Sequence, residues 1–126
     1  MLPTAPEERP DLNDMKNTVS VKENCVFRAV YRHGKRSVCK TVAVYVMKTR
    51  QKGVNRLGIT ASVKLGGAVV RNRIRRRLKE AYRLSESKIG CGYTIVLAAR
   101  SDAEKAPFLS ILGDLDRAFS ELGMKI

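Results

Sequence analysis

The chain has 126 residues, a length that fits one domain built around a single core. Its apolar fraction of 44% excludes a wholly disordered chain, and no apolar run is long enough to cross a membrane. The formal net charge is +13, and residues 15–100 alone carry +18. So much like charge on one folded domain favours a polyanionic partner.

The first 16 residues contain three prolines, four acids and little apolar material. This composition predicts a disordered or loosely held acidic leader segment, followed by a single α/β domain over residues 17–126. The start of the chain lacks the basic-then-apolar order of a signal peptide. We therefore expect a cytoplasmic protein that does not bind a membrane.

Residues 22–32 carry apolar side chains at helical spacing, with Asn24 as the expected N-cap and Gly34 as the expected stop. Residues 40–48 alternate as a strand does, with Val42, Val44 and Val46 on one face and residues 43, 45 and 47 on the other. A polar turn follows over residues 48–56.

In residues 56–64, apolar residues alternate with small or polar residues more regularly than in the preceding strand. Leu57, Ile59, Ala61 and Val63 are predicted to form an apolar face, and the opposite face consists of small or polar residues. This pattern is typical of a sheet with one face on the core and the other uncovered. The uncovered face has no bulky side chain to keep a ligand away.

Gly66 and Gly67 end this strand and precede a long helix over residues 68–85, whose apolar stripe includes Ile74, Leu78 and Tyr82. Residues 93–99 form a hydrophobic strand, apolar enough to be central. A second amphipathic helix runs from Phe108 to about residue 122, between Pro107 and Gly123. The order αβ(β)βαβα predicts an α+β fold, a two-layer α/β sandwich.

The three cysteines, Cys25, Cys39 and Cys91, are widely spaced and form no C-x-x-C pair. A zinc site could be drawn from them and His33, but the spacing is unlike a ligand knuckle. We expect three reduced thiols, most of them packed in the fold.

The strongest motif lies in the long helix, where six basic residues and one asparagine occupy nine positions around Ile74 and Leu78. They are Arg71, Asn72, Arg73, Arg75, Arg76, Arg77 and Lys79. A solvated charged face would normally mix signs for i to i+4 pairing, and only Glu80 is acidic here. Arginine grips two phosphate oxygens at once and stacks on bases, so this helix indicates a nucleic-acid contact.

Two neighbouring features are weaker. Asn72 could hydrogen-bond a base edge or a 2′-hydroxyl, or it could only cap the local backbone. Gly66 and Gly67 would let a phosphate approach the helix N-terminus. No G-x-x-x-x-G-K-[ST] loop is present, so no nucleoside triphosphate site is indicated.

Residues 64–76, with the sequence KLGGAVVRNRIRR, resemble the signature segment of the bacterial ribonuclease P protein component. The resemblance extends over about residues 19–122, because residues 27–34, 56–59 and 92–100 also match family segments. Two departures affect fine contacts: Val63 stands before Lys64 where the family commonly has lysine, and Gly67 stands where a polar residue is frequent. The acidic leader segment has no reliable family counterpart.

The resemblance implies a ribosomal-protein-like fold of order αβββαβα, with a mixed four-stranded sheet and an unusual left-handed βαβ crossover through the basic helix. It also implies that the protein binds a catalytic RNA subunit, which uses magnesium to remove the 5′ leader from precursor tRNA. No protein ligand for the metal and no further protein partner are expected. The basic helix would contact the catalytic RNA.

The resemblance further implies that the sheet face beside the first helix holds the single-stranded leader of precursor tRNA. Aromatic rings stack on bases of any identity, which suits a leader of variable sequence. The expected leader-binding residues are Phe27, Tyr31, Tyr45, Thr60, Ser62 and Lys64. For Phe27, core packing is an equally good interpretation.

No catalytic residue is expected in the protein. The only histidine, His33, is better explained as a structural residue beside Gly34 than as a general base, and no carboxylates cluster in the basic region. Two alternatives belong to other classes. A ribosomal structural protein would bind mature ribosomal RNA without affecting precursor tRNA, and a protein-only nuclease would cleave without RNA.

Overall fold

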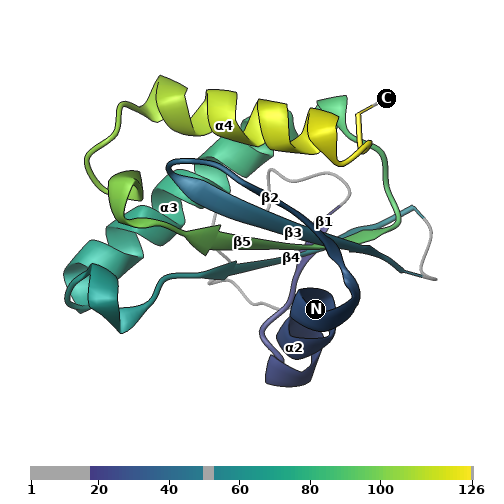
Figure 1. Cartoon of the computed structure of the whole chain (residues 1–126), viewed down its shortest axis with the longest axis horizontal. Coiled ribbons are helices and arrows are strands. Elements are labelled where there is room, and N and C mark those ends of the chain that lie inside the picture. Colours follow the sequence, from purple (N-terminus) through teal and green to yellow (C-terminus); the bar gives the residue numbers. More distant parts are fainter. Residues whose placement is uncertain (1–17, 50–52, 126) are drawn as a thin grey trace, which may run out of the picture.

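The computed structural model describes residues 18–49 and 53–125 and contains a five-stranded mixed sheet (Figure 1). The strands are β1 (Thr18–Ser20), β2 (Lys35–Val38), β3 (Val42–Lys48), β4 (Asn55–Thr60) and β5 (Tyr93–Ala99). Their order in the sheet is β1-β4-β5-β3-β2. The pairs β1–β4 and β4–β5 are parallel, whereas β3 is antiparallel to both β5 and β2. The residues assigned to the acidic leader segment lie outside the described residues.

Three helices pack on this sheet, and short 3₁₀ turns connect the elements. The helices are α2 (Asn24–His33), α3 (Ala68–Ser85) and α4 (Phe108–Glu121); the turns are η1 (Val63–Leu65), η2 (Glu86–Lys88) and η3 (Ser101–Ala103). Figure 1 shows α3 and α4 together on one side of the sheet and α2 on the other. The predicted α+β sandwich is confirmed, and α2 adds a short layer on the second face.

The main core lies between the sheet and the pair α3 and α4. Val44 and Leu97 contribute from the sheet, Ile74 and Leu78 from α3, and Phe119 from α4, and each of these five side chains is fully buried. Burying each such side chain stabilises the fold by about 1.5–3 kcal/mol. The helical and strand periods predicted these core positions correctly.

A buried polar network attaches β1 and β4 to the C-terminal half of α3. The Tyr82 hydroxyl lies 2.8 Å from Thr18 Oγ1 and accepts a hydrogen bond from Asn55 Nδ2 at 3.4 Å. Thr18 also donates to Glu86 at 2.5 Å. Burial raises the pKa of Tyr82 to about 12, although the hydrogen bonds with Thr18 and Asn55 oppose that rise.

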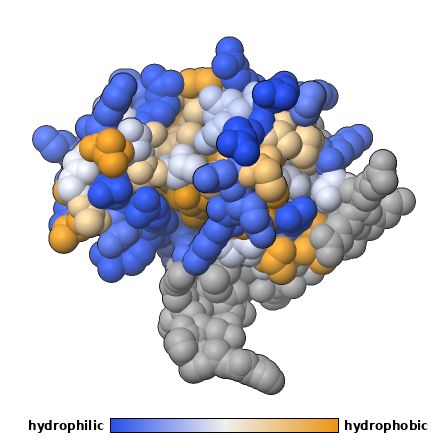
Figure 2. Space-filling view, turned by 90° about the horizontal axis from the view of Figure 1, so that it is seen from below, coloured by the Kyte–Doolittle hydropathy of each residue, from blue (hydrophilic) through white to orange (hydrophobic). Residues whose placement is uncertain are grey.

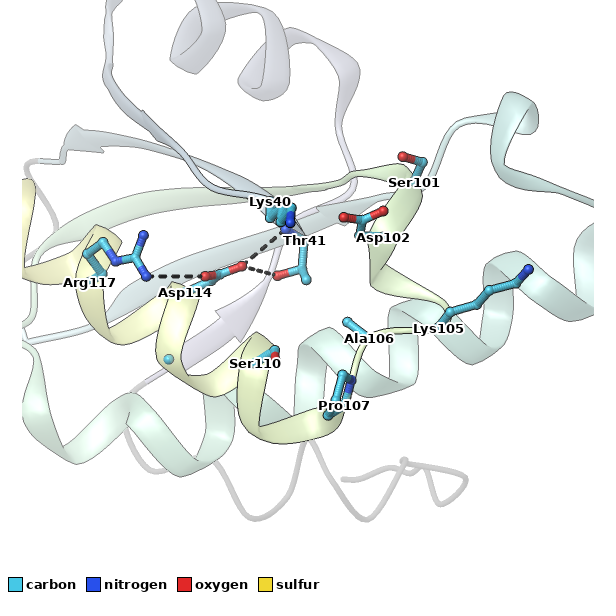
Figure 3. A pocket seen from close by; sticks show the side chains of 11 residues that line it. Lys40, Thr41, Ser101, Asp102, Lys105, Ala106, Pro107, Ser110, Asp114 and Arg117 are labelled. Atoms are coloured by element: carbon cyan, nitrogen blue, oxygen red, sulfur yellow. Dashed lines mark hydrogen bonds and ion pairs between the residues drawn. The ribbon is translucent and has the colours of Figure 1, made fainter.

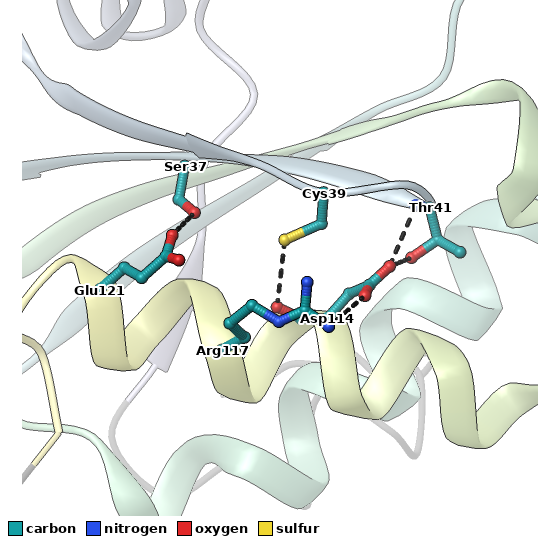
Figure 4. Close-up of polar contacts among 6 residues, drawn as sticks. All are labelled: Ser37, Cys39, Thr41, Asp114, Arg117 and Glu121. Carbon is teal, nitrogen blue, oxygen red and sulfur yellow. Dashed lines mark hydrogen bonds and ion pairs between the residues drawn. The ribbon is translucent and has the colours of Figure 1, made fainter.

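Polar contacts also fix α4 on the edge of the sheet formed by β2 and β3 (Figure 4). The Thr41 amide and hydroxyl both donate to Asp114 Oδ2, at 3.1 and 2.6 Å. Ser37 donates to Glu121 at 2.6 Å, and the Cys39 thiol contacts the Asp114 carbonyl. Burial raises the pKa of the Cys39 thiol, so this cysteine stays protonated and unreactive.

Several expectations from the sequence are corrected. The sheet has five strands instead of four, because the three-residue β1 pairs with β4. The strand predicted over residues 56–64 ends at Thr60, and Val63 lies 73% exposed in η1 instead of on the core face. The chain leaves the sheet here because Ser62 accepts a hydrogen bond from the Lys64 amide and starts the turn. Glu23, not Asn24, is the N-cap of α2.

The prediction that most cysteines are packed was also wrong. Cys39 is buried, but Cys25 and Cys91 are exposed free thiols. Cys25 lies on the outer side of the first turn of α2, and Cys91 lies in the bend that precedes β5. Neither position needs an apolar side chain.

Candidate nucleic-acid interface

The basic helix α3 begins directly after a turn that leaves its first residues open. Gly67 is the N-cap, has no side chain to cap the helix, and would have open space around a Cβ atom. Gly66 has a φ of 142°, which favours glycine, and its carbonyl accepts a hydrogen bond from Arg71 Nε at 3.2 Å. The Arg71 side chain therefore folds back beside the turn.

The central motif residues lie on the outer side of α3. Asn72, Arg73 and Arg76 are exposed, whereas Ile74 and Leu78 between them are fully buried. Within the described part of the chain, no hydrogen bond or ion pair holds Arg76. We call the set Arg71, Asn72, Arg73, Arg75, Arg76 and Lys79 the basic face.

Asn72 is oriented by its neighbour on the same helix. Arg75 Nη1 donates a hydrogen bond to Asn72 Oδ1 at 3.0 Å. Because a guanidinium group can only donate, the amide oxygen must point toward Arg75. The Asn72 amide NH₂ group is therefore turned away from Arg75 and can donate to a phosphate oxygen, a base carbonyl or a 2′-hydroxyl.

Arg77 differs from the rest of the motif, because its guanidinium group binds the loop between β5 and α4. It donates to the Ala103 carbonyl at 2.9 Å, to the Glu104 carbonyl at 2.5 Å and to the Ala106 carbonyl. Arg73 reaches the same loop, where its Nη1 lies 3.5 Å from Glu104 Oε2, but its side chain remains 52% exposed. The sequence pattern could not separate these two arginines, because both are predicted on the exposed side of the helix.

A second group of residues lies on the opposite face of the sheet, beside α2. Tyr31 of α2 and Tyr45 of β3 pack edge to face, with ring centroids 4.8 Å apart. Tyr31 is 43% exposed and Tyr45 is half-buried. Figure 2, which views the molecule from the side of α2, shows a mostly hydrophilic surface with small, separate hydrophobic patches.

Phe27 covers part of the sheet face that the sequence predicted to be open. A Cβ atom at Gly58 would lie 2.1 Å from Phe27 Cε1, so the ring sits directly on the Gly58 backbone. Phe27 is half-buried. Its position thus combines the two interpretations, because the ring packs on the sheet and still borders the surface.

The other residues predicted for this face lie at the end of β4 and around η1, in a different segment from the two tyrosines. Thr60 is half-buried at the end of β4, and Ser62 and Lys64 are exposed in and around η1. Ser62 uses its hydroxyl to accept from the Lys64 amide. His33 is the exposed last residue of α2, so burial gives no support to a structural role for its side chain.

A cavity of about 550 Å³ lies between the turn before β3, the loop after β5 and one side of α4 (Figure 3). Lys40, Lys105 and Arg117 line it together with Asp102 and the buried Asp114. Both hydrogen bonds from Thr41 hold Asp114 in the wall of this cavity. The sequence did not predict it, because its lining comes from three separate segments.

The described residues contain no group of three or more His, Cys, Asp or Glu side chains that could hold a metal ion. No helix among them is long and apolar enough to span a membrane. The two acids nearest the basic face are already paired: Glu80 with Arg83 and Glu104 with Arg73. The hydrogen bond from Arg83 lowers the pKa of Glu80, so this acid stays ionised.

Comparison with known proteins gives a consistent result. The family described as Ribonuclease P matches residues 15–123 of this chain. The chain is 40% identical, over 110 residues, to the ribonuclease P protein component of Clostridioides difficile (strain 630), covering 86% of this chain and 92% of that protein. It is 36% identical to the corresponding protein of Symbiobacterium thermophilum, over 87% of this chain and 96% of that protein.

Solved structures agree with the sequence relatives. A Staphylococcus aureus RNase P protein mutant with defective mRNA degradation activity matches with a TM-score of 0.74 and 30% identity, over 83% of this chain and 88% of that chain. The RNase P protein from Thermotoga maritima matches with a TM-score of 0.65 and 26% identity, over 72% of this chain and 86% of that chain.

Proposed function

This chain belongs to the bacterial ribonuclease P protein family and is a protein component of the ribonuclease P holoenzyme, and from this premise we propose how it contacts its two RNAs. The basic face of α3 binds the catalytic RNA subunit. The face formed by Phe27, Tyr31 and Tyr45 binds the 5′ leader of precursor tRNA. The protein thereby assists an RNA-catalysed cleavage that produces the mature tRNA 5′ end.

The observation that carries this proposal is the exposed arginine surface on a rigid helix, where Arg73 stays 52% exposed although it pairs with Glu104. Arg73 and Arg76 point outward from a helix whose other side is locked into the core by Ile74 and Leu78. A fixed row of guanidinium groups suits the regular phosphate spacing of folded RNA. We leave Arg77 out of the contact set, because three carbonyls of the loop after β5 already bind it.

The two tyrosines support the proposal for the leader. A T-shaped pair leaves the face of one ring available for stacking, and stacking on a base does not depend on base identity. Thr60, Ser62 and Lys64 extend this surface toward α3 with hydroxyls and one positive charge. A leader strand that follows these residues runs from α2 toward the basic face.

We assign the magnesium to the RNA subunit. The described residues offer no cluster of metal ligands, and carboxylates are scarce around the basic face. Besides stacking on the leader, the protein acts electrostatically, because its positive charge lowers the repulsion between the leader and the catalytic RNA.

The proposal is tested by precursor tRNA cleavage at low magnesium concentration, with and without the catalytic RNA. Protein alone should leave labelled precursor intact, and adding the protein should restore cleavage by the RNA. Correct 5′ maturation by the protein alone that survives micrococcal nuclease treatment would show that the RNA is not the catalyst.

Binding to the catalytic RNA should depend strongly on salt, because each neutralised phosphate releases counterions. Changing Arg71, Arg73 and Arg76 together to Ala should flatten the plot of log affinity against log salt by about two to three units. A folded triple variant with unchanged slope and affinity would remove α3 from the interface.

A further inference from the structure

Two highly exposed valines lie just before and just inside the start of α3. Val63 in η1 is 73% exposed and Val69 in the first turn of α3 is 72% exposed. The two elements pack against each other, at the left end of the molecule in Figure 1. Both side chains therefore face solvent at the same end of the molecule.

Folding gives no reason for valine at either position. Side chains this exposed add little to the core, and valine is a poorer helix former than alanine or lysine because its branched Cβ crowds the preceding turn. The valine that packs inward at this point of α3 is Val70, which is partly buried against Gly66 and the core. Two exposed apolar side chains at the same end of the molecule, beside the basic face, fit a contact with a partner.

The surroundings of the two valines identify the chemistry of that partner. Val69 lies three, four and seven residues before Asn72, Arg73 and Arg76, so it continues their row along the outer side of α3. Lys64 is exposed directly after Val63. A partner that covers these valines also meets the positive charges of Lys64, Arg73 and Arg76, which favours a polyanion.

We infer that Val63 and Val69 bind the apolar face of an unpaired nucleotide in the catalytic RNA, an inference that rests on the proposed function of the basic face. A base-paired stem would present mainly phosphates and polar groove edges to this end of α3. An unstacked nucleotide instead exposes the flat face of its base while its phosphates remain beside the arginines. RNA without unpaired nucleotides at this site would leave the valines uncovered.

The test measures both the affinity and its salt dependence. Losing an apolar contact lowers the affinity only, whereas losing a phosphate contact also lowers the salt dependence. The double variant Val63→Thr with Val69→Thr keeps side-chain shape but replaces a methyl group by a hydroxyl at each position. It should bind the catalytic RNA about tenfold more weakly, with an unchanged salt slope. Arg76→Ala should instead lower the slope by about 0.7–0.9.

The matched control is Leu109→Thr, which removes another highly exposed apolar side chain, 77% exposed, from the first turn of α4. This variant should bind the catalytic RNA as the unchanged chain does. Wild-type affinity in the double valine variant would overturn the inference, and so would an equal loss in Leu109→Thr.

Val69→Ala provides a readout that a purely structural role would not give. Because alanine is the better helix former, this variant should melt at a higher temperature than the unchanged chain while it binds the RNA more weakly. Parallel changes in stability and affinity would overturn the inference, as would valine-dependent self-association of the free protein in sedimentation experiments. If the unchanged chain failed to bind the catalytic RNA, the proposed function itself would fall.

Discussion

Arginines only a few positions apart on α3 differ in what their guanidinium groups contact. Arg77 binds three backbone carbonyls, whereas Arg76 is exposed and unpaired within the described residues. The sequence motif predicts a cationic helix, but it cannot show which of the charged side chains are bound by other parts of the fold. That distinction depends on the loop after β5, which is 26 to 29 residues away in the sequence.

Arg77→Met should therefore destabilise the protein without weakening its electrostatic attraction to RNA. Losing hydrogen bonds to three backbone carbonyls of the loop after β5 should lower the free energy of unfolding by about 1–3 kcal/mol, measured by urea denaturation. The salt slope of RNA binding should stay unchanged. Arg76→Ala is the control, with unchanged stability and a lower slope.

Tyr45→Ala should weaken precursor tRNA binding more than mature tRNA binding, because only the precursor has a leader. Losing one base-stacking ring costs about 1–3 kcal/mol, or about five- to 150-fold in affinity. Tyr45→Phe keeps the ring and its edge-to-face contact with Tyr31 and should bind nearly as the unchanged chain does. Equal weakening of both tRNAs by Tyr45→Ala in an assembled holoenzyme would exclude Tyr45 from leader binding.

At the scale of elements, the docking of α2 on the sheet depends on one glycine. Gly58 of β4 leaves room for the Phe27 ring, and a Cβ atom there would meet the ring at 2.1 Å. The helix can approach the sheet closely only because β4 lacks a side chain at this point. This contact also sets the distance between α2 and the aromatic residue of β3.

Gly58→Ala should push the Phe27 ring and α2 away from β4. The overpacking should cost about 1–3 kcal/mol of stability, measured by thermal or urea unfolding. Leader binding should weaken as well, while affinity for the catalytic RNA should be retained because α3 lies on the other face of the sheet. In the double variant Gly58→Ala with Phe27→Ala the clash is absent, so stability should fall less than the two single losses added together.

The sequence predicted the long, strongly periodic elements well. The bounds of α3 and β5 agree with the predicted ranges, and the stripe through Ile74, Leu78 and Tyr82 is buried. The predictions failed where short-range polar contacts or distant segments decide the structure. The turn at Ser62 ends β4 early, and β1 is a strand only because β4 pairs with it.

The difference between local periodicity and tertiary contacts also explains which parts of the candidate interface could be predicted. A single helix with 3.6 residues per turn places its charges by local geometry alone, so the outward position of Arg73 and Arg76 followed from the sequence. The relation of Phe27 to Gly58 and of Tyr31 to Tyr45 requires the packing of α2 on the sheet. The positions of these residues along the sequence do not predict that tertiary packing.

For the whole molecule, the buried Tyr82 should make the free energy of unfolding decrease at alkaline pH. Its pKa is about 12 in the folded protein against a usual value of about 10, so the folded chain holds this proton more tightly than the unfolded chain. The resulting stabilisation is complete below pH 10 and is lost as the pH rises from about 10 to 12. Unfolding measured between pH 9 and 12 should show that decline.

Tyr82→Phe separates this effect from the titration of the lysines. The variant should be less stable by about 1 kcal/mol at pH 7, because it loses the hydrogen bonds with Thr18 and Asn55. Its stability should fall less steeply than that of the unchanged chain above pH 10. Parallel pH curves for the two proteins would show that Tyr82 does not titrate differently in the folded state.

The central place of β5 has a consequence for how the chain reaches its native state. β5 joins the β1–β4 pair to the β2–β3 hairpin, yet it is the last of the strands in the sequence. During synthesis the two halves of the sheet have no shared strand until residue 99 is available, so cooperative folding must wait for most of the chain. Until then the chain is unfolded, and the net positive charge of residues 15–100 repels itself and favours an extended chain. We therefore expect folding to be completed after translation and to be accelerated by any polyanion present.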